Sequence, residues 1–196
     1  DAARIGKWDL RPGGFIFCSA GRIERTKGLS TLIEAYRMLG TEMPLVIAGG
    51  GAATDTAYFE ELKGGDTKGI VFTGFLTGDE FFALYAHAAV FVFPSEYEAM
   101  SMALLEGLSF GTPTVYSDIP ENEAVAAGIG YPFRVSDAVD LKEKLLYVLG
   151  NPAEAHAMGR KAIGRITENH SWEAIARQYH EIYLKMAEGA RPGRPK

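Results

Sequence analysis

Two glutamates in the segment FVFPSEYEAMSMALLEGL are the first candidates for chemistry. Glu98 follows an apolar run, and Glu106 stands eight residues later inside a second apolar stretch that we expect to be helical. Eight helical residues rise about 12 Å, so these carboxylates cannot share one proton as a close pair does. A buried carboxylate needs hydrogen-bond donors, which the hydroxyls of a sugar ring can supply. The spacing therefore favours two carboxylates that bind separate parts of one long ligand.

The residues between the two glutamates could bind an anion. The expected helix would begin within this segment, and the free amides and dipole of a helix N-terminus attract negative charge. A structural alternative is that Glu98 faces the helix dipole and Glu106 is a charge on the helix surface. The residues that would form the N-terminus are Ala99, Met100, Ser101, Met102 and Ala103.

A second candidate loop, SAGRIERTKGLS, combines cations with glycines. Gly21, Arg22, Lys27 and Gly28 stand ahead of a helix that we expect to begin at Leu29. Cations beside a helix N-terminus are typical of a phosphate site, although solvated surface cations remain an alternative. Neither the dinucleotide pattern GxGxxG nor the P-loop pattern GxxxxGK followed by Ser or Thr occurs in this loop, which disfavours NAD binding and ATP hydrolysis.

Two glycine-rich turns follow other expected strands. The run from Gly49 to Gly51 would let a ligand or a neighbouring loop approach the backbone closely, or would form a plain tight turn. Further along, Gly74 precedes Phe75 and Leu76, whose side chains could flank a flat base or pack within the domain. The sequence alone leaves both alternatives open in each turn.

Metal and thiol chemistry have little support in the sequence. The histidines have no ligand spacing, and no cluster of Cys, His and carboxylate suggests a metal site, so we expect no cofactor and no metal. Cys18 is the single cysteine and lies in an apolar run, which excludes an internal disulfide and predicts a buried thiol. The histidines are His87, His156, His170 and His180.

Short apolar runs rich in β-forming residues alternate with amphipathic stretches. Continuous rather than alternating hydrophobicity predicts strands that are covered on both faces. Strand and helix alternate about every 25 residues, which predicts right-handed βαβ units. We therefore expect an α/β fold with a Rossmann-like, doubly wound parallel sheet, in which ligands bind beyond the carboxyl ends of the strands. The expected strands are Phe15–Ala20, Leu45–Ala48, Ile70–Thr73, Val90–Phe93, Thr114–Ser117 and, more weakly, Gly130–Phe133.

The C-terminal part of the chain is predicted to be helical, over Ala138–Leu149, Ala153–Thr167 and Trp172–Met186. Ser171 is a good N-cap for the last helix, whose apolar face should be buried against another surface. We expect one domain over residues 15–187, a lead-in over residues 1–14 and a disordered tail over residues 188–196. Because the chain does not begin with Met, we also expect it to be part of a longer protein.

The composition excludes several classes of protein. The 196 residues are 47% hydrophobic and 23% charged, with a net charge of -5, which is typical of a globular domain. A chain of this mass buries about 70% of its unfolded surface, enough for one sizeable core. The acidic balance without a basic block argues against nucleic acid as a partner. No signal-peptide pattern or membrane-spanning run is visible, and we expect a cytoplasmic location.

Taken together, the motifs resemble the C-terminal, donor-binding domain of GT-B glycosyltransferases of family 4, also called group 1, a retaining group. They are GRIERTKG after the first strand, FTG after the third, and PSEYEAMSMALLEGLSFGTPTVYSDIPE with its Glu-x7-Glu, and the resemblance runs from about Phe15 to Met186. It implies that Arg22 and Lys27 hold the diphosphate of a nucleotide-sugar donor. It further implies that Glu98 contacts the transferred sugar and that Glu106 binds the ribose hydroxyls.

The same resemblance implies the partners of the chain. The donor would be a UDP-, GDP- or ADP-sugar whose base lies against Gly74, Phe75 and Leu76. The acceptor, a saccharide or a lipid-linked sugar in polysaccharide biosynthesis, would be held by an N-terminal half that this chain does not contain. The full-length enzyme could then be peripheral to a membrane, and the isolated domain is expected to be inactive.

Two departures from the family pattern bear on these expectations. Glu98-Ala99-Met100-Ser101 stands where the family usually has Glu-Gly-Phe-Gly, which puts the sugar specificity in question. Gly107 follows Glu106 where Ala is common, at a cost of about 1 kcal/mol in the middle of a helix. The alternatives are a GT-B nucleotide-sugar 2-epimerase and a non-catalytic nucleotide- or sugar-binding α/β module. A receiver-like regulatory domain fits poorly, because cations rather than acidic residues follow the first strand.

Overall fold

A computed structural model describes residues 1–51 and 56–189, which are built around one six-stranded sheet. All the strand pairs are parallel, and the strand order is β3-β2-β1-β4-β5-β6. The order reverses between β1 and β4, which is where doubly wound sheets bind ligands. The predicted Rossmann-like fold is confirmed. The strands are β1 (Ile16–Ile23), β2 (Leu45–Gly51), β3 (Ile70–Gly74), β4 (Val90–Phe93), β5 (Thr114–Ser117) and β6 (Tyr131–Phe133).

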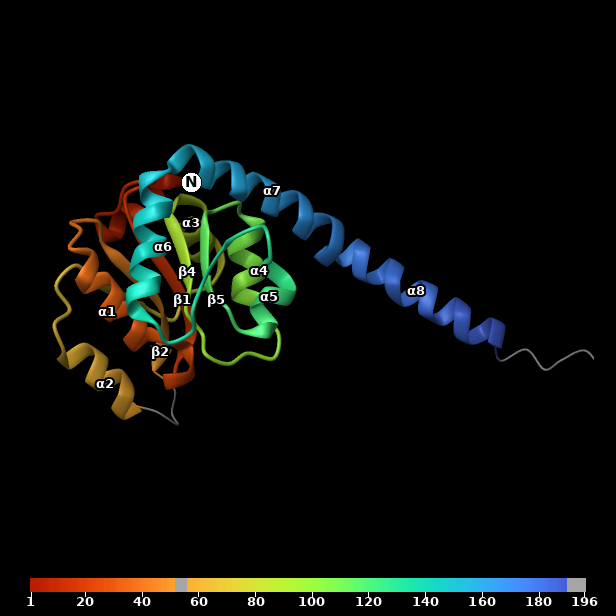
Figure 1. The fold of residues 1–196 in the computed structure, drawn as a ribbon, viewed down its shortest axis with the longest axis horizontal. Coiled ribbons are helices and arrows are strands. Elements are labelled where there is room, and N and C mark those ends of the chain that lie inside the picture. The colour runs from red at the N-terminus through yellow and green to blue at the C-terminus, as the bar shows by residue number, and fades with distance from the viewer. Residues whose placement is uncertain (52–55, 190–196) are drawn as a thin grey trace, which may run out of the picture.

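Helices cover both faces of the sheet (Figure 1). One hydrophobic core lies between the sheet and α1, α2 and α6, and a second lies between the sheet and η1, α3, α4 and α5. Helix α7 contributes Ala155 to the first core and Ala162 and Ile166 to the second, so it passes from one side of the domain to the other. The helices are η1 (Ala2–Trp8), η2 (Arg25–Lys27), α1 (Leu29–Leu39), α2 (Thr56–Gly64), α3 (Gly78–His87), α4 (Met102–Ser109), α5 (Pro120–Ala126), α6 (Ala138–Gly150), α7 (Pro152–His170) and α8 (Trp172–Gly189).

The burial of the strands follows their apolar composition. Every residue of β4 and β5 is buried, and so are the first five residues of β1 and of β2. This confirms the prediction that continuous apolar runs form strands covered on both faces. Edge strand β3 is only half-buried along its length.

The first strand is longer than predicted. It continues past Ala20 to Ile23, so Gly21 and Arg22 belong to β1 rather than to the loop after it. The pairing of β1 with β2 shifts register between Ser19 and Gly21. Gly21 has a φ of 61°, a conformation that glycine adopts without strain, and the shift lets the strand continue.

The helix that carries Glu106 begins later than predicted. It starts at Met102, and the Ser101 hydroxyl caps it by accepting the Leu104 N–H at 3.1 Å. Ala99 and Met100 therefore precede the helix, and Glu106 lies about one turn inside it rather than two. The 12 Å rise expected between the two glutamates was wrong, because Glu98 is in a loop. A side-chain cap within an apolar stretch decided the boundary.

The N-terminal lead-in packs on the domain. Ile5 in η1 is fully buried, and Arg4 forms an ion pair of 2.8 Å with Asp79 at the start of α3. Leu10 is also buried.

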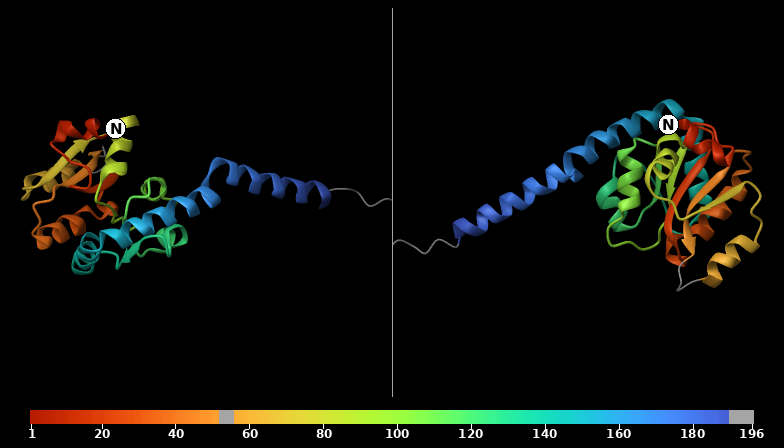
Figure 2. Two further views of the ribbon diagram at one scale, coloured as in Figure 1. Left: turned by 90° about the horizontal axis from the view of Figure 1, so that it is seen from above. Right: turned by 180° about the vertical axis from the view of Figure 1, so that it is seen from behind.

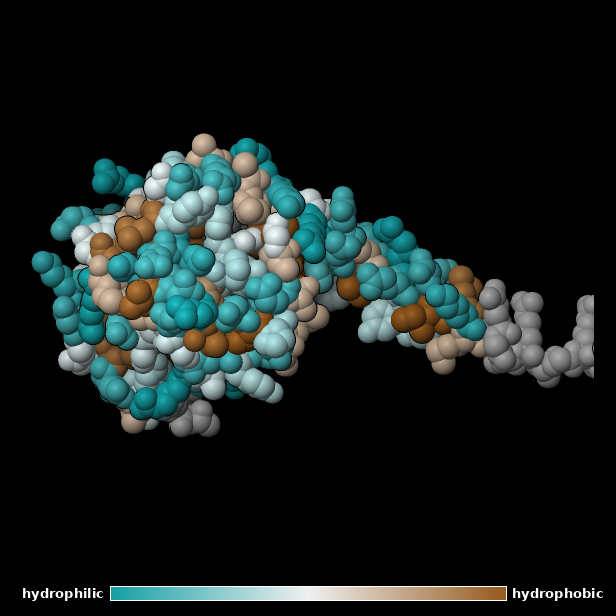
Figure 3. Space-filling model, in the orientation of Figure 1, coloured by the Kyte–Doolittle hydropathy of each residue, from teal (hydrophilic) through white to brown (hydrophobic). Residues whose placement is uncertain are grey.

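The last helix forms an arm. Figures 1 and 2 show α8 running away from the sheet beyond the end of α7, and no helix among residues 1–51 and 56–189 is both long and apolar enough to span a bilayer. The cap by Ser171 is confirmed, since its hydroxyl accepts the Ala174 N–H at 3.2 Å. The apolar face that should be buried is instead exposed, with Trp172 85% and Tyr183 63% accessible. Brown patches mark apolar residues on the arm in Figure 3.

The disordered tail was predicted to begin at residue 188, which is before the last helix ends. Helix α8 continues to Gly189, so positions 188 and 189 are helical, and residues 190–196 lie outside the described part of the chain.

Helix α7 offers a paired test of its packing. A Cβ at Gly159 would overlap the Gly111 carbonyl oxygen, whereas a Cβ at Gly164 meets nothing within 4 Å. We expect Gly159→Ala to destabilise the fold by roughly 1–3 kcal/mol, as overpacking does. Gly164→Ala should stabilise it by roughly 0.5–1 kcal/mol, because alanine loses less backbone entropy. Urea unfolding followed by circular dichroism measures both changes, and equal effects would contradict the close approach of α7 to Gly111.

Candidate active site

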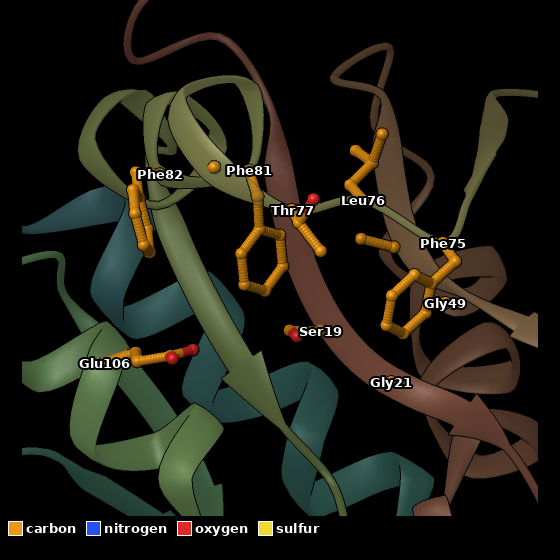
Figure 4. Close-up of a pocket in the computed structure, with 11 residues that line it drawn as sticks. Ser19, Gly21, Gly49, Phe75, Leu76, Thr77, Phe81, Phe82 and Glu106 are labelled. Carbon is orange, nitrogen blue, oxygen red and sulfur yellow. The ribbon is translucent and has the colours of Figure 1, made fainter.

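Two adjoining pockets open above the carboxyl ends of the central strands. The first, called here the aromatic pocket, has a volume of about 290 Å³ and lies between β1, β2, α3 and Glu106 (Figure 4). The second, the charged pocket, has a volume of about 160 Å³ and is lined by Lys27, Glu98 and the start of α4. Ser19 and Gly21 line both pockets, so the two form one cleft across the end of β1. Its place is the one expected from the reversal of strand order.

The wall of the aromatic pocket comes from the turn after β3 and from the first part of α3. Phe75 is 71% exposed, and Leu76 lies beside it in the wall. Phe81 faces them across the pocket in Figure 4. Gly74, the third residue predicted here, does not line the pocket, but its φ of 75° allows the turn that presents Phe75. A flat aromatic ligand can lie between such side chains.

Glu106 closes the other side of the aromatic pocket. Its carboxylate points into the space in Figure 4 and accepts a hydrogen bond of 3.1 Å from the Tyr85 hydroxyl. Burial raises the pKa of Glu106, and the bond from Tyr85 opposes that rise. A carboxylate in this setting gains from further donors, such as the hydroxyls of a bound sugar.

The charged pocket contains an ion pair between two predicted residues. Lys27 Nζ lies 2.8 Å from Glu98 Oε1, and the two side chains are 23% and 12% exposed. Two contacts between loops bring them together. The Glu96 N–H donates to the Thr26 carbonyl at 2.8 Å, and Gly28 packs so closely on Pro94 that a Cβ there would overlap the proline carbonyl. The glycine also has a φ of 64°, which disfavours any other residue.

Arg22 lies outside the cleft. Its side chain is 79% exposed, and its Nε is 3.6 Å from Glu24. Strand residues alternate between the two sides of a sheet, so extending β1 to Ile23 determines where this side chain points. The structure therefore brings only one of the two predicted cations, Lys27, beside Glu98.

Only part of the predicted anion-binding segment, residues 99–103, lines the charged pocket. Ser101, Met102 and Ala103 line the charged pocket, and the first amides of an α-helix have no partner inside the helix. Ala99 does not line the pocket, and Met100 lies in an apolar groove against α8. The later start of α4 explains this division.

Several cleft residues were missed by sequence reasoning. Ser19 is the polar exception within the apolar run of β1, a signal that could have been used. Phe81 and Phe82 stand in an amphipathic stretch, where the sequence does not distinguish a core residue from one that lines a pocket. Gly107 has a packing reason, because a Cβ there would overlap the ring of Phe91. The unpredicted lining residues are Ser19, Ala20, Ala48, Thr77, Gly78, Phe81, Phe82 and Phe93, and Gly49 of the glycine run also lines the aromatic pocket.

A metal centre has no matching donor set in the part of the chain that the structure describes. There, no three or more His, Cys, Asp and Glu side chains group closely enough to hold an ion. Burial raises the pKa of the Cys18 thiol to about 12, so this thiol is not a nucleophile near neutral pH.

Curated relatives of the chain are glycosyl-transferring enzymes by name. Glycogen synthase of Mycobacterium tuberculosis (strain H37Rv) is 33% identical over 203 aligned residues, which cover 100% of this chain and 49% of that protein. Alpha-maltose-1-phosphate synthase of the same strain is 30% identical over 186 residues, covering 85% of this chain and 46% of that protein. The chain thus spans about half the length of these relatives.

Solved structures share the fold. Sucrose-phosphate synthase from Thermosynechococcus elongatus matches 97% of this chain and 50% of its own with a TM-score of 0.81 and 25% identity. Anabaena Alr3699/HepE in complex with UDP and glucose gives a TM-score of 0.85 at 16% identity, covering 94% of this chain and 52% of that one. The C-terminal domain of LpcC, a glycosyl transferase group 1 family protein from Francisella tularensis, matches 87% of this chain and 93% of its own, with a TM-score of 0.74 and 18% identity.

The family model described as "Glycosyl transferases group 1" matches residues 3–165, which include every residue of the cleft. With that match and the relatives above, the chain belongs to the group 1 glycosyl transferases.

Proposed function

We propose that the chain is the donor-binding half of a retaining, family 4 glycosyltransferase and that its cleft holds a nucleotide sugar. The observation that carries the proposal is the continuity of the two pockets over Ser19 and Gly21. Along the cleft, an aromatic wall is followed by a carboxylate and then by a cation beside a helix N-terminus. This order matches the base, the ribose and the diphosphate of a nucleotide sugar. The resemblance to a UDP-bound fold supports the same reading.

In this proposal, each part of the donor contacts a different group of residues in the cleft. The base lies against Phe75, Leu76 and Phe81, and the ribose hydroxyls donate to Glu106. The diphosphate lies between Lys27 and the first amides of α4, where positive side-chain charge and the helix dipole add. Glu98 is then the group nearest to the transferred sugar.

Transfer breaks the bond between the anomeric carbon of the sugar and the diphosphate oxygen, and a bond to the acceptor oxygen replaces it. Negative charge develops on the leaving diphosphate, and Lys27 with the α4 amides is placed to stabilise it, which is usually the largest contribution to catalysis. The acceptor hydroxyl gives its proton to the departing diphosphate oxygen, which balances the step, and in a retaining enzyme the incoming oxygen attaches on the face that the diphosphate leaves.

The ion pair of the free cleft must change when the donor binds. Lys27 is bonded to Glu98 at 2.8 Å, so a diphosphate that takes up Lys27 competes with Glu98 for it. The released carboxylate can then accept hydroxyls of the sugar. This exchange would explain why a carboxylate lies in a pocket that binds an anion.

A ligand panel tests the proposed function. Thermal shifts of the 196-residue chain with UDP, GDP, ADP and their sugars should show stabilisation by one nucleotide series, about 2.7 kcal/mol at a ligand concentration 100 times the Kd. EDTA should leave the shift unchanged, because Lys27 and the α4 amides supply the positive charge. A shift that requires Mg²⁺, or none with any nucleotide, would contradict the proposal.

Lys27 should matter for the diphosphate far more than Arg22. Loss of a charge-assisted bond costs roughly 1.5–3 kcal/mol, so Lys27→Met should weaken nucleoside diphosphate binding about 10- to 100-fold and leave the free nucleoside nearly unaffected. The matched control is Arg22→Met, where an exposed cation should contribute less than about 1 kcal/mol. Isothermal calorimetry with both ligands measures the difference. Equal losses for nucleoside and diphosphate would refute the assignment of Lys27 to the phosphates.

We expect the ionised carboxylate of Glu106 to accept hydrogen bonds from the ribose hydroxyls. Glu106→Gln should weaken the free nucleoside and the diphosphate by the same factor, measured by calorimetry, because the ribose is common to both. Since burial raises the pKa of Glu106, wild-type affinity should fall as the pH is lowered through that raised pKa.

The stability of the free chain gives a second readout for Glu106. A carboxyl with a raised native pKa binds its proton more tightly in the folded state, so this group stabilises the fold at low pH and that contribution is lost as the pH rises. The neutral Gln variant should therefore be no less heat-stable than wild type at pH 7. A nucleoside affinity unchanged by Glu106→Gln would make Glu106 irrelevant to the ribose.

The isolated chain should bind a donor but not transfer its sugar. Positioning a second reactant is worth roughly 7–11 kcal/mol of the barrier, and the cleft holds only the donor. A radiolabelled donor assay with candidate saccharide acceptors checks this. Robust transfer by the 196 residues alone would mean that the acceptor site lies within them.

A further inference from the structure

We propose that Tyr85 is a positioning residue for donor binding, which holds the Glu106 carboxylate in the orientation that accepts the ribose hydroxyls. The inference rests on the proposed function, because that function assigns the ribose to Glu106. Tyr85 does not line either pocket, so it acts through Glu106 and not by touching the ligand.

The ring of Tyr85 is held firmly within the aromatic core. It is fully buried, and it packs edge-on against Phe17 and Phe91, with ring centroids 4.9 Å and 5.0 Å away. On another side it stacks parallel to Phe110 at 5.6 Å. Aromatic contacts of this kind favour one ring orientation, and they therefore determine where the hydroxyl lies.

The hydroxyl reaches two acceptors on α4. It is 3.1 Å from Glu106 Oε2 and 3.2 Å from the Ala103 carbonyl oxygen, one turn earlier on the same helix. The bond to Glu106 ties the carboxylate to α3, and the Ala103 carbonyl competes for the single proton of the hydroxyl. Among the described residues, no other side chain donates a hydrogen bond to the Glu106 carboxylate, since the Ser109 hydroxyl bonds only to the Glu106 backbone carbonyl.

The bond from Tyr85 affects the pKa of Glu106. Burial raises the pKa of Glu106, and the Tyr85 hydroxyl lowers it by bonding to the charged form. Tyr85 stays protonated because burial raises its own pKa strongly, so it is a donor throughout the neutral range. Without this donor, Glu106 would hold its proton to higher pH, and the protonated carboxyl would accept more weakly from the ribose.

Among the described residues, the other ionisable groups on neighbouring elements are not bonded to the Glu106 carboxylate. Lys27 and Glu98 pair in the charged pocket, and Cys18 is buried on β1 near Tyr85. On the helices behind α4, Glu123 of α5 accepts from Tyr116, and Arg165 of α7 donates to the Ala127 carbonyl. Tyr85 is thus the titratable group that bonds to the carboxylate.

The test compares two tyrosine–glutamate pairs in the same chain. Tyr85→Phe removes the hydroxyl and keeps the ring, and Tyr116→Phe does the same to a fully buried tyrosine that donates to Glu123 at 3.3 Å, away from the cleft. We expect Tyr85→Phe to weaken nucleoside binding about 3- to 10-fold at pH 7, as loss of a typical intramolecular hydrogen bond does, and to move the acid limit of binding to higher pH. Tyr116→Phe should leave both unchanged.

A direct titration makes the result independent of any nucleotide. Carbon-13 NMR of glutamate side chains in the free chain, assigned with Glu106→Gln, should show a higher pKa for Glu106 in Tyr85→Phe than in wild type or Tyr116→Phe. An unchanged Glu106 pKa in Tyr85→Phe would overturn the inference. If Glu106→Gln leaves nucleoside affinity unchanged, the ribose assignment fails and the inference fails with it. If that variant loses affinity and Tyr85→Phe does not, only the role of Tyr85 is refuted.

Discussion

The close backbone contact between Gly28 and Pro94 is the constraint on which the cleft depends. It joins the loop after β1 to the loop after β4, across the point where the strand order reverses. No side chain larger than hydrogen fits at Gly28, because a Cβ would overlap the Pro94 carbonyl and the φ is positive. The contact brings Lys27 to Glu98, two residues far apart in the sequence whose pairing gives the charged pocket its chemistry.

The fold was predictable because its signals are local and repeated. All six strands begin within one residue of their expected positions, since buried parallel strands appear in the sequence as continuous apolar runs. The errors lie where a single backbone contact decides the outcome. A glycine in the left-handed region extends β1 through Gly21, and the Ser101 cap delays α4 until Met102. Neither contact has a periodic signature, so hydrophobic patterning could not reveal it.

The site residues also divide into those that residue type and spacing reveal and those that depend on contacts formed only in the fold. Glu98, Glu106 and Lys27 were chosen from residue type and spacing, and the structure places all three in the cleft. Arg22 has the same chemistry as Lys27, yet the longer β1 directs it to solvent, where it is 79% exposed. Tyr85 could not be identified from the sequence, because an apolar helix position is consistent with any buried aromatic. Its hydroxyl gains importance only from the distance to Glu106.

The exposed apolar face of α8 and the open cleft are both surfaces that a second domain could cover. The face of α8 leaves Trp172 and Tyr183 in contact with water, a cost that burial on another surface would remove. In the proposed function the sugar lies beside Glu98, where the cleft is open, and the chain matches about half the length of its relatives. A retaining transfer needs water kept from the sugar while the acceptor approaches, and an open cleft cannot do this alone. In the proposed function, therefore, the donor half determines which nucleotide is bound and how the leaving group is stabilised, and closure by a second surface determines whether the sugar reaches an acceptor or water.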